Sequence, residues 1–244
     1  QIMRKASKQI VSGETSVHIT AGSLKEYLGV PKFKDDVIIN QDAVGIVNGL
    51  AYTTVGGTML EIEASAVDGS GKIELTGSLG EVMTESAKAA VSYVRKNAEN
   101  YGIEPDFYKT KDIHIHATEA ATKKDGPSAG VSMATAVISA LSGRKIRHDV
   151  AMTGEISILG RVFAIGGVKE KTMAAYTSGI KTVILPEDNR PDLEELDSEV
   201  KSGLEFYFAK NMDDVLNIAL VENEPQNNYT SIGAKPEKDM GIRA

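Results

Sequence analysis

Hydrophobic and polar positions recur along this chain with two different periods, which predict strands and helices. Residues 59–67 alternate between apolar and polar side chains, which is typical of a half-buried strand. The β-rich stretch 44–53 precedes them, and Gly56-Gly57 lies between the two as a predicted hairpin turn. After Ser128, apolar positions recur every three or four residues until Gly143, which predicts a helix that ends at a glycine.

The same two periods, punctuated by glycine and proline, predict the remaining elements. Further helices are expected at residues 3–11, 23–29, 82–101, 168–178, 191–201 and 212–220. Further strands are expected at residues 16–20, 72–76, 112–116, 150–153, 155–158, 161–165, 181–185 and 204–208. Strands come first and helices then alternate with strands, so the order predicts an α+β fold with mixed sheets flanked by helices.

Three segments of different character divide the chain. Residues 1–37 are too few to bury a core of their own, so we expect them to be the end of an upstream domain and a linker. Residues 38–221 carry the pattern of the predicted α+β domain, whereas residues 222–244 are polar and predict a disordered tail. The chain opens on Gln1 rather than Met, and we expect it to be a fragment of a longer polypeptide.

The composition and the net charge argue against several classes of protein and several kinds of site. A formal net charge of -7 argues against a general nucleic-acid binder, although it leaves room for a local basic patch. Without cysteine the chain has no disulfide, no thiolate nucleophile and no cysteine-based zinc site, which fits a reducing compartment. No apolar run approaches the roughly 20 residues of a membrane span and no signal peptide is visible, so we expect no membrane partner.

A serine stands where a predicted loop enters a helix, in the stretch Lys124-Asp125-Gly126-Pro127-Ser128-Ala129-Gly130. Backbone N–H groups in a first helical turn have no intrahelical partner, and the helix dipole adds positive potential there. Ser128 therefore has the exposure and the nearby donors that a nucleophile needs. The alternative is that Ser128 only caps the helix, as serine often does.

A nucleophilic serine needs a base, and histidine is the first candidate. His114 and His116 are two positions apart on a predicted strand, so both rings face the same side. They are then two metal ligands, the base of a serine–histidine pair, or simply two polar rings on a strand face. Only Glu119 or Asp112 offers a third ligand, so zinc has little support and we expect no metal.

Lysine is the second candidate base. Lys169 and Lys171 follow Gly166-Gly167 at a predicted helix start, and they point about 200° apart, so one should face inward and the other solvent. Burial that lowers a lysine pKa by roughly three units, at a cost of about 4 kcal/mol, would make a useful base near neutral pH. The alternative is that both lysines are surface charges.

Two motifs are incomplete. The run Asp68-Gly69-Ser70-Gly71-Lys72-Ile73 resembles half a phosphate-binding loop, but Ala66 and Ile73 replace required residues, so a hairpin turn is expected. The Ser-x-x-Lys spacing of β-lactam-binding enzymes is absent, because Val131 stands where the lysine would be.

At larger scale the chain resembles the Lon proteases, ATP-dependent serine endopeptidases with a Ser-Lys dyad. Residues 124–130 resemble the nucleophile motif of that family. Further stretches that match are Val44–Gly57, Leu75–Ala87, Asp112–Glu119, Met152-Thr153-Gly154-Glu155-Ile156-Ser157 and Ile165-Gly166-Gly167-Val168-Lys169-Glu170-Lys171. Residues 1–35 resemble the end of the ATPase module that precedes the proteolytic domain.

The resemblance implies a role for each matching residue. Ser128 attacks the scissile carbonyl, Lys171 rather than Lys169 is the base, and Thr153 hydrogen-bonds the lysine. Backbone N–H groups near Ser128 and Asp125 form the oxyanion hole. Supporting roles fall to Asp125, Glu155, His114, His116 and Glu119.

The resemblance also implies a Lon-type α+β domain in a six-membered ring, with the dyads facing an inner chamber. The substrates are unfolded polypeptides, and the partner is the ATPase domain of the same chain. The fragment itself needs no cofactor, since ATP and Mg²⁺ belong to the full-length protein. The expected location is the bacterial cytoplasm, in preference to the mitochondrial matrix.

The chain departs from the family at two places and leaves two other functions open. Ala120 stands where the family has a glycine, and Ala164 where it usually has a proline. Neither residue belongs to the dyad, so activity is expected. The alternatives are a scaffold with an unreactive serine and a different Ser-Lys hydrolase, such as a self-cleaving or signal-processing peptidase.

Overall fold

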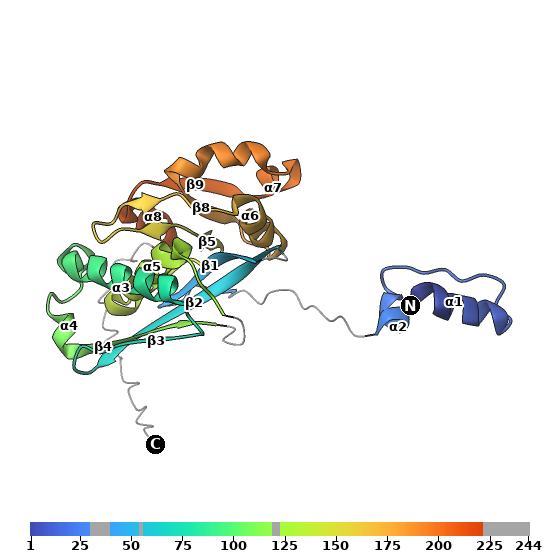
Figure 1. Ribbon diagram of the computed structural model, residues 1–244, viewed down its shortest axis with the longest axis horizontal. Coiled ribbons are helices and arrows are strands. Elements are labelled where there is room, and N and C mark those ends of the chain that lie inside the picture. Colours follow the sequence, from blue (N-terminus) through green and yellow to red (C-terminus); the bar gives the residue numbers. More distant parts are fainter. Residues whose placement is uncertain (30–39, 54–55, 119–122, 222–244) are drawn as a thin grey trace, which may run out of the picture. The chain divides into compact units, whose positions relative to one another are not determined.

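The computed structural model describes residues 1–29, 40–53, 56–118 and 123–221 and divides the chain into two compact units, Gln1–Ile38 and Ile39–Ala244 (Figure 1). Within these ranges, no helix has both the length and the apolar character needed to cross a membrane. The predicted linker and the predicted tail 222–244 lie outside the described residues, as do Glu119 and Ala120.

The smaller unit contains two helices, α1 (Ile2–Val11) and α2 (Leu24–Leu28). Tyr27 Oη donates a 2.7 Å hydrogen bond to Gln9 Oε1 and ties the second helix to the first. The predicted strand at 16–20 is wrong, because these residues form no strand. Ser23 precedes α2 as predicted, but its hydroxyl accepts a hydrogen bond from Thr20 N–H instead of capping the helix.

The larger unit is built on a seven-stranded mixed sheet with the order β3-β4-β2-β1-β5-β8-β9, which confirms the predicted α+β class. The strands are β1 (Ile46–Thr53), β2 (Gly56–Asp68), β3 (Ile73–Thr76), β4 (Lys111–Ala117), β5 (Val150–Met152), β8 (Thr182–Pro186) and β9 (Glu205–Ala209). β2 pairs antiparallel with β1 and β4, and the other pairings are parallel. β6 (Glu155–Ile156) and β7 (Val162–Phe163) form a separate small hairpin, as predicted.

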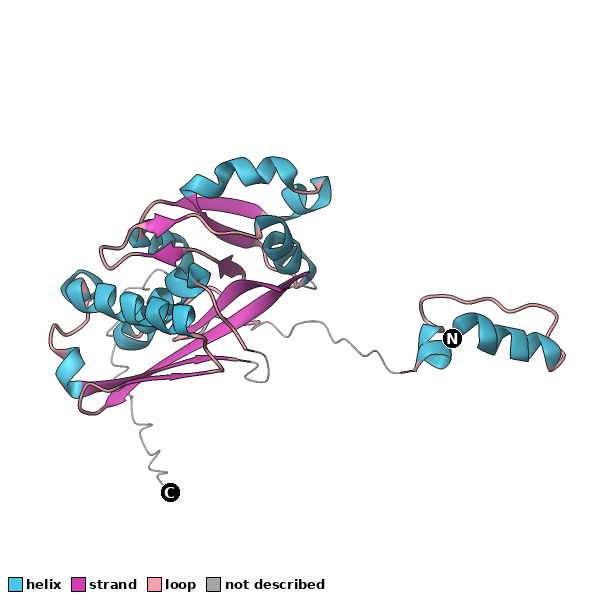
Figure 2. Cartoon of the chain, in the orientation of Figure 1, coloured by secondary structure: helices cyan, strands magenta, loops and turns pink. Residues whose placement is uncertain are grey.

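Helices cover both faces of this sheet (Figure 2). The larger core lies under α3 (Glu81–Lys96), α5 (Gly130–Ser142) and α8 (Met212–Ala219), where residues such as Ile62, Ile115, Met133 and Ile138 are fully buried. Alternate strand positions point to the other face. There, α6 (Val168–Thr177) packs on β1 and β2, and α7 (Ser198–Gly203) packs on α6.

Several predicted elements need correction. Helix α3 ends at Lys96, and the residues after it form a 3₁₀ turn, η1 (Ala98–Tyr101). On α3, Val82 is 45% exposed, whereas Met83 is buried. The predicted helix 191–201 is instead a 3₁₀ segment, η3 (Glu187–Glu195), followed by α7, and α4 (Phe107–Thr110) was not predicted.

The two predicted glycine turns also differ from the structure. Gly56 and Gly57 belong to β2, where they pair with Thr53 and Tyr52. The turn at 69–71 does not join a hairpin, because β3 pairs with β4, and β4 lies between β3 and β2. Local turn signals identify the bend correctly but not the strand that the next segment joins.

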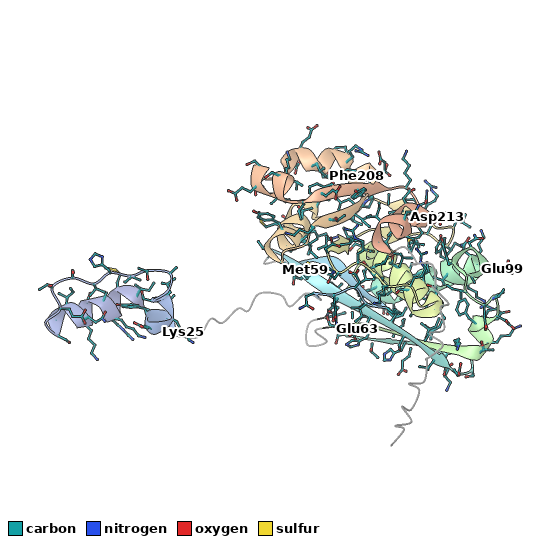
Figure 3. All side chains as sticks on the ribbon, turned by 180° about the vertical axis from the view of Figure 1, so that it is seen from behind. Lys25, Met59, Glu63, Glu99, Phe208 and Asp213 are labelled. Carbon is teal, nitrogen blue, oxygen red and sulfur yellow. The ribbon has the colours of Figure 1, made fainter. Side chains whose placement is uncertain are left out.

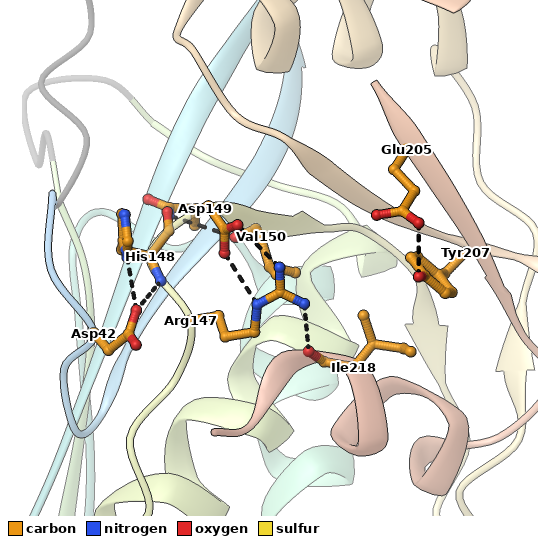
Figure 4. A network of polar contacts seen from close by, with 9 residues as sticks. Asp42, Arg147, His148, Asp149, Val150, Glu205, Tyr207 and Ile218 are labelled. Atoms are coloured by element: carbon orange, nitrogen blue, oxygen red, sulfur yellow. Dashed lines mark hydrogen bonds and ion pairs between the residues drawn. The ribbon is translucent and has the colours of Figure 1, made fainter. Parts of the chain in front are cut away.

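One loop after α5 holds the first and the last described segments of the larger unit (Figure 4). Asp42 Oδ1 accepts hydrogen bonds from His148 N–H at 3.0 Å and from His148 Nδ1 at 2.6 Å, and these bonds lower the Asp42 pKa. Ile146 pairs with Ala43 on one side and Leu220 on the other. The first and last described segments of this unit are therefore anchored to the same few residues.

Candidate active site

A cavity of about 540 Å³ lies beside the start of α5. Its walls are the paired ends of β1 and β2, the loop 123–129, and residues 164–166 together with Lys171 of α6. Much of the lining is apolar, including Leu50, Met59, Leu60, Met83, Pro127 and Ile165. The cavity can therefore accept an apolar side chain next to the polar groups of the loop.

The start of α5 presents Ser128 to this cavity. A 3₁₀ turn, η2 (Pro127–Ala129), runs into α5, which confirms that Ser128 stands where a loop enters a helix. The helix-cap alternative is wrong, because Ala129 occupies the cap position of α5 and no side chain caps either η2 or α5. Ser128 C=O accepts hydrogen bonds from Gly154 N–H at 2.8 Å and from Thr153 Oγ1 at 3.2 Å.

Helix α6 brings Lys171 to the same cavity. Lys171 is 3% exposed, and its Nζ donates a 3.1 Å hydrogen bond to Thr153 Oγ1. Burial disfavours the ammonium form and lowers the pKa of Lys171 from 10.5 to about 8. Thr153 thus joins Lys171 Nζ to the main chain of Ser128, and within the described residues no hydrogen bond joins Lys171 Nζ directly to Ser128 Oγ.

The two lysines of α6 diverge as the helical geometry predicts. The side chain of Lys169 is 51% exposed and lies 3.6 Å from Asp197 in an ion pair on the surface. Of these two lysines, only Lys171 lines the cavity. The backbone of β2 at Gly57 packs directly against this turn of α6, because a Cβ atom at Gly57 would lie 2.0 Å from Glu170 O.

Asp125 holds the loop before Ser128 against the start of α3. Its Oδ1 accepts backbone hydrogen bonds of 3.1 Å from Met83 and from Gly126. Gly80 makes room for the carboxylate, since a Cβ atom there would lie 2.2 Å from Asp125 Cγ. Ser86 Oγ also donates to Pro127 O at 3.2 Å, so the first turns of α3 hold the loop in place.

Other candidate residues do not come together with Ser128. His114 and His116 share one face of β4, as predicted, but they line a separate hollow with Glu63, where both rings hydrogen-bond to Thr76 Oγ1 at 2.8 and 2.7 Å. In Figure 3, Met59 of the cavity and Glu63 of this hollow mark two positions along β2. Glu155 lies on β6 and is not among the residues that line the cavity.

The metal alternative for the two histidines gains no support. Throughout the described ranges, no group of three or more His, Cys, Asp or Glu side chains is arranged to hold a metal ion. The prediction for Glu119 lies outside the described residues. Ala164, which departs from the family pattern, lines the cavity without a polar group.

Sequence reasoning missed several residues of the cavity. Met83 and Leu50 come from a helix and a strand far from residues 124–130 in the chain, and no local pattern connects them. Gly57 is not among the lining residues, but it lets α6 approach β2 closely, and a glycine inside a strand often marks such an approach. The sequence contains that signal, but a pair of glycines between two predicted strands is also typical of a hairpin turn.

Comparison with known proteins agrees with this fold. Residues 18–222 match the model of the Lon protease (S16) C-terminal proteolytic domain. The Lon protease of Finegoldia magna is 52% identical over 222 residues, and Lon protease 1 of Bacillus subtilis is 51% identical over 221 residues. The Lon protease of Escherichia coli K12 is 50% identical over 227 residues. These alignments cover 91%, 90% and 92% of this chain and 29% of each relative, so the chain spans less than a third of their length.

The α+β fold and the family match define a proteolytic domain. The chain belongs to the Lon protease family, as its C-terminal proteolytic domain.

Proposed function

We propose that this chain is the proteolytic part of an ATP-dependent serine endopeptidase, with Ser128 as nucleophile and Lys171 as general base. The burial of Lys171 in the cavity that Ser128 lines is the observation that supports this assignment. With a pKa of about 8, roughly a tenth of the lysine side chains are neutral at pH 7. Lys169 is exposed and paired with Asp197, so it is neither buried nor next to Ser128 in the cavity.

In the proposed reaction, Lys171 Nζ takes the proton of Ser128 Oγ while Oγ bonds to the scissile carbonyl carbon. The ammonium then gives that proton to the leaving amine, and the C–N bond breaks to leave an ester on Ser128. Lys171 then takes a proton from water as the water oxygen bonds to the ester carbon. It returns that proton to Ser128 Oγ as the ester C–O bond breaks and the acid product leaves. Catalytic hydrogen bonds are often long before substrate binds, so the contact of Lys171 with Thr153 is compatible with this step.

The neighbouring residues support the proposed dyad unequally. Thr153 orients Lys171, and Asp125 positions the loop that precedes Ser128. Backbone N–H groups near Ser128 and Asp125 are the proposed oxyanion donors, since first-turn N–H groups have no intrahelical partner. The geometry lends no support to roles in catalysis for His114, His116 or Glu155, which lie outside the cavity lining.

For the whole protein we infer partners beyond this chain. The relatives are more than three times as long, which supports a larger chain with an upstream module. The proposed module is an ATPase that uses ATP and Mg²⁺ and ends within residues 1–37. The proposed assembly is a six-membered ring around an inner chamber, in the cytoplasm. The proposed substrates are unfolded polypeptides, whose exposed apolar side chains suit the apolar cavity lining.

Active-site labelling and substrate choice test this proposal. A peptide boronate should bind Ser128 reversibly and inhibit hydrolysis of casein, and Ser128→Ala should lose both binding and hydrolysis. A folded substrate should stay intact, and ATP should not change the rate. A wild-type chain that neither binds the boronate nor cleaves casein would favour the scaffold alternative. Hydrolysis by Ser128→Ala would contradict the nucleophile.

The pH dependence of turnover should follow the neutral fraction of Lys171. Because the base must be unprotonated, kcat should fall about tenfold for each pH unit below 8 and level off above it. Initial rates on a quenched fluorescent peptide between pH 6 and 9.5 would measure the curve. A plateau that already begins near pH 6.5 would instead indicate a base with the pKa of histidine.

A further inference from the structure

The rim of the cavity has the opposite charge to the chain as a whole. The chain carries a formal net charge of -7, yet among the residues that the structure describes the cavity lining includes Lys123, Lys124 and Lys171 against one carboxylate, Asp125. That carboxylate accepts two backbone hydrogen bonds and so has part of its charge compensated locally. A concave site lined by one sign of charge raises the local concentration of the opposite charge.

The three lysines are not equivalent. Lys171 is buried, and Lys124 Nζ lies 3.5 Å from Gly77 O, toward the end of β3. Lys123 is exposed, lines the cavity, and lies in the loop that leads to Ser128. It is therefore the lysine best placed to meet a side chain of a bound peptide.

We propose that Lys123 is a specificity-determining residue, which favours substrates with an acidic side chain within a few positions of the scissile bond. This inference rests on the proposed peptidase function and names the substrate class of that site. The apolar part of the lining accepts one side chain, and Lys123 at the rim attracts a neighbouring Asp or Glu. An exposed ion pair changes a rate or an affinity by about 1.5- to 5-fold, and salt weakens it.

A charge scan of one parent peptide tests the inference. Quenched fluorescent peptides with a single cleaved bond would carry Glu, Gln or Lys at each of the three positions on either side. At the most sensitive position, kcat/KM should be about 1.5- to 5-fold higher for Glu than for Gln, and lower for Lys. In Lys123→Glu the order of Glu and Lys should reverse. In 0.5 M NaCl the wild-type difference should shrink.

The control is Lys145→Glu, which makes the same charge change on the loop after α5. Ser128 lies before α5 and Lys145 lies after it, so this helix of 13 residues separates them by about 20 Å. Lys145→Glu should keep the wild-type order of peptides. Equal rates for Glu and Lys peptides in the wild type, or an unchanged order in Lys123→Glu, would overturn the inference while leaving the peptidase function intact.

Binding separates the two proposals if turnover fails. Anisotropy titrations of labelled Glu and Lys peptides onto Ser128→Ala measure the charge preference without cleavage. A tighter Kd for the Glu peptide that is lost in Ser128→Ala/Lys123→Glu supports the inference. Equal Kd values contradict it. Absence of cleavage by the wild type counts against the proposed function alone.

Discussion

Lys171→Met is expected to lower kcat for peptide hydrolysis by about 10²–10⁴-fold, the usual contribution of a general base. Methionine fills a similar volume but has no proton acceptor of useful basicity. Lys169→Met should keep most of the turnover, because Lys169 lies on the surface in an ion pair with Asp197. The measurement is steady-state hydrolysis of one peptide by the three proteins at pH 8. Full activity in Lys171→Met, or loss only in Lys169→Met, would exclude the assigned base.

The same substitution should raise stability at pH 7, which distinguishes loss of catalysis from loss of fold. The pKa of Lys171 falls from 10.5 to about 8 on folding, so below pH 8 the buried ammonium costs about 3 kcal/mol. Between pH 8 and 10.5 only the unfolded chain binds the proton, and wild-type stability therefore rises with pH. Methionine removes this cost and loses one hydrogen bond of about 1 kcal/mol.

Melting curves at two pH values check this expectation. At pH 7, Lys171→Met should melt a few degrees above the wild type, since each kcal/mol shifts Tm by about 2–4 °C in a domain of this size. At pH 9.5 the difference should shrink, because most of the native lysine is then neutral. A lower Tm for Lys171→Met at pH 7 would mean that packing around Lys171, not its charge, dominates.

Local periodicity predicts where Ser128 lies and that one of two lysines faces inward. Pro127 and the apolar repeat after Ser128 predict the junction where Ser128 lies. Helical geometry predicts that Lys169 and Lys171 face different sides, whereas the choice of Lys171 as the inward one follows from the family resemblance. Both inferences depend on neighbours within one or two turns, and both agree with the structure.

Long-range packing was not predictable in the same way. Strand alternation correctly places His114 and His116 on one face, but it does not say that this face is opposite the core or that Thr76 lies between the rings. That depends on β3 pairing with β4, a partner choice made through the sheet. The wall of the cavity at Met83 arises likewise from packing between elements distant in sequence.

Short helical segments failed for a different reason. Residues 191–201 have the polar, charged composition of a surface helix, which predicts a helix with Pro191 as its first residue. The structure accommodates Pro191 within the 3₁₀ segment η3 and begins α7 after Asp197. Such a helix boundary depends on how the segment packs against the rest of the fold, so composition alone does not determine it.

Gly57→Ala is expected to lower kcat by roughly 10²-fold, the effect of about 1 Å misplacement of a catalytic group. The added Cβ would lie 2.0 Å from Glu170 O, 2.4 Å from Glu170 C and 3.0 Å from Lys171 N. These are backbone atoms, so the first turn of α6 must move as a unit and carry Lys171 with it. Gly203→Ala is the matched control, since its Cβ would crowd only the ring of Tyr176, at 2.3 Å.

The pH profile shows whether the loss in Gly57→Ala comes through Lys171. Moving α6 away from β2 lets water reach the lysine, which raises its pKa from about 8 back toward 10.5. The rise in kcat with pH should therefore shift to higher pH in Gly57→Ala and stay in place in Gly203→Ala. The other titratable groups of the described cavity lining are Tyr52, which pairs with Gly57 across β1 and β2, and Lys123, Lys124 and Asp125 in the loop before Ser128. A Gly57→Ala protein with the kcat and the pH profile of the wild type would show that the close contact between β2 and α6 does not position Lys171.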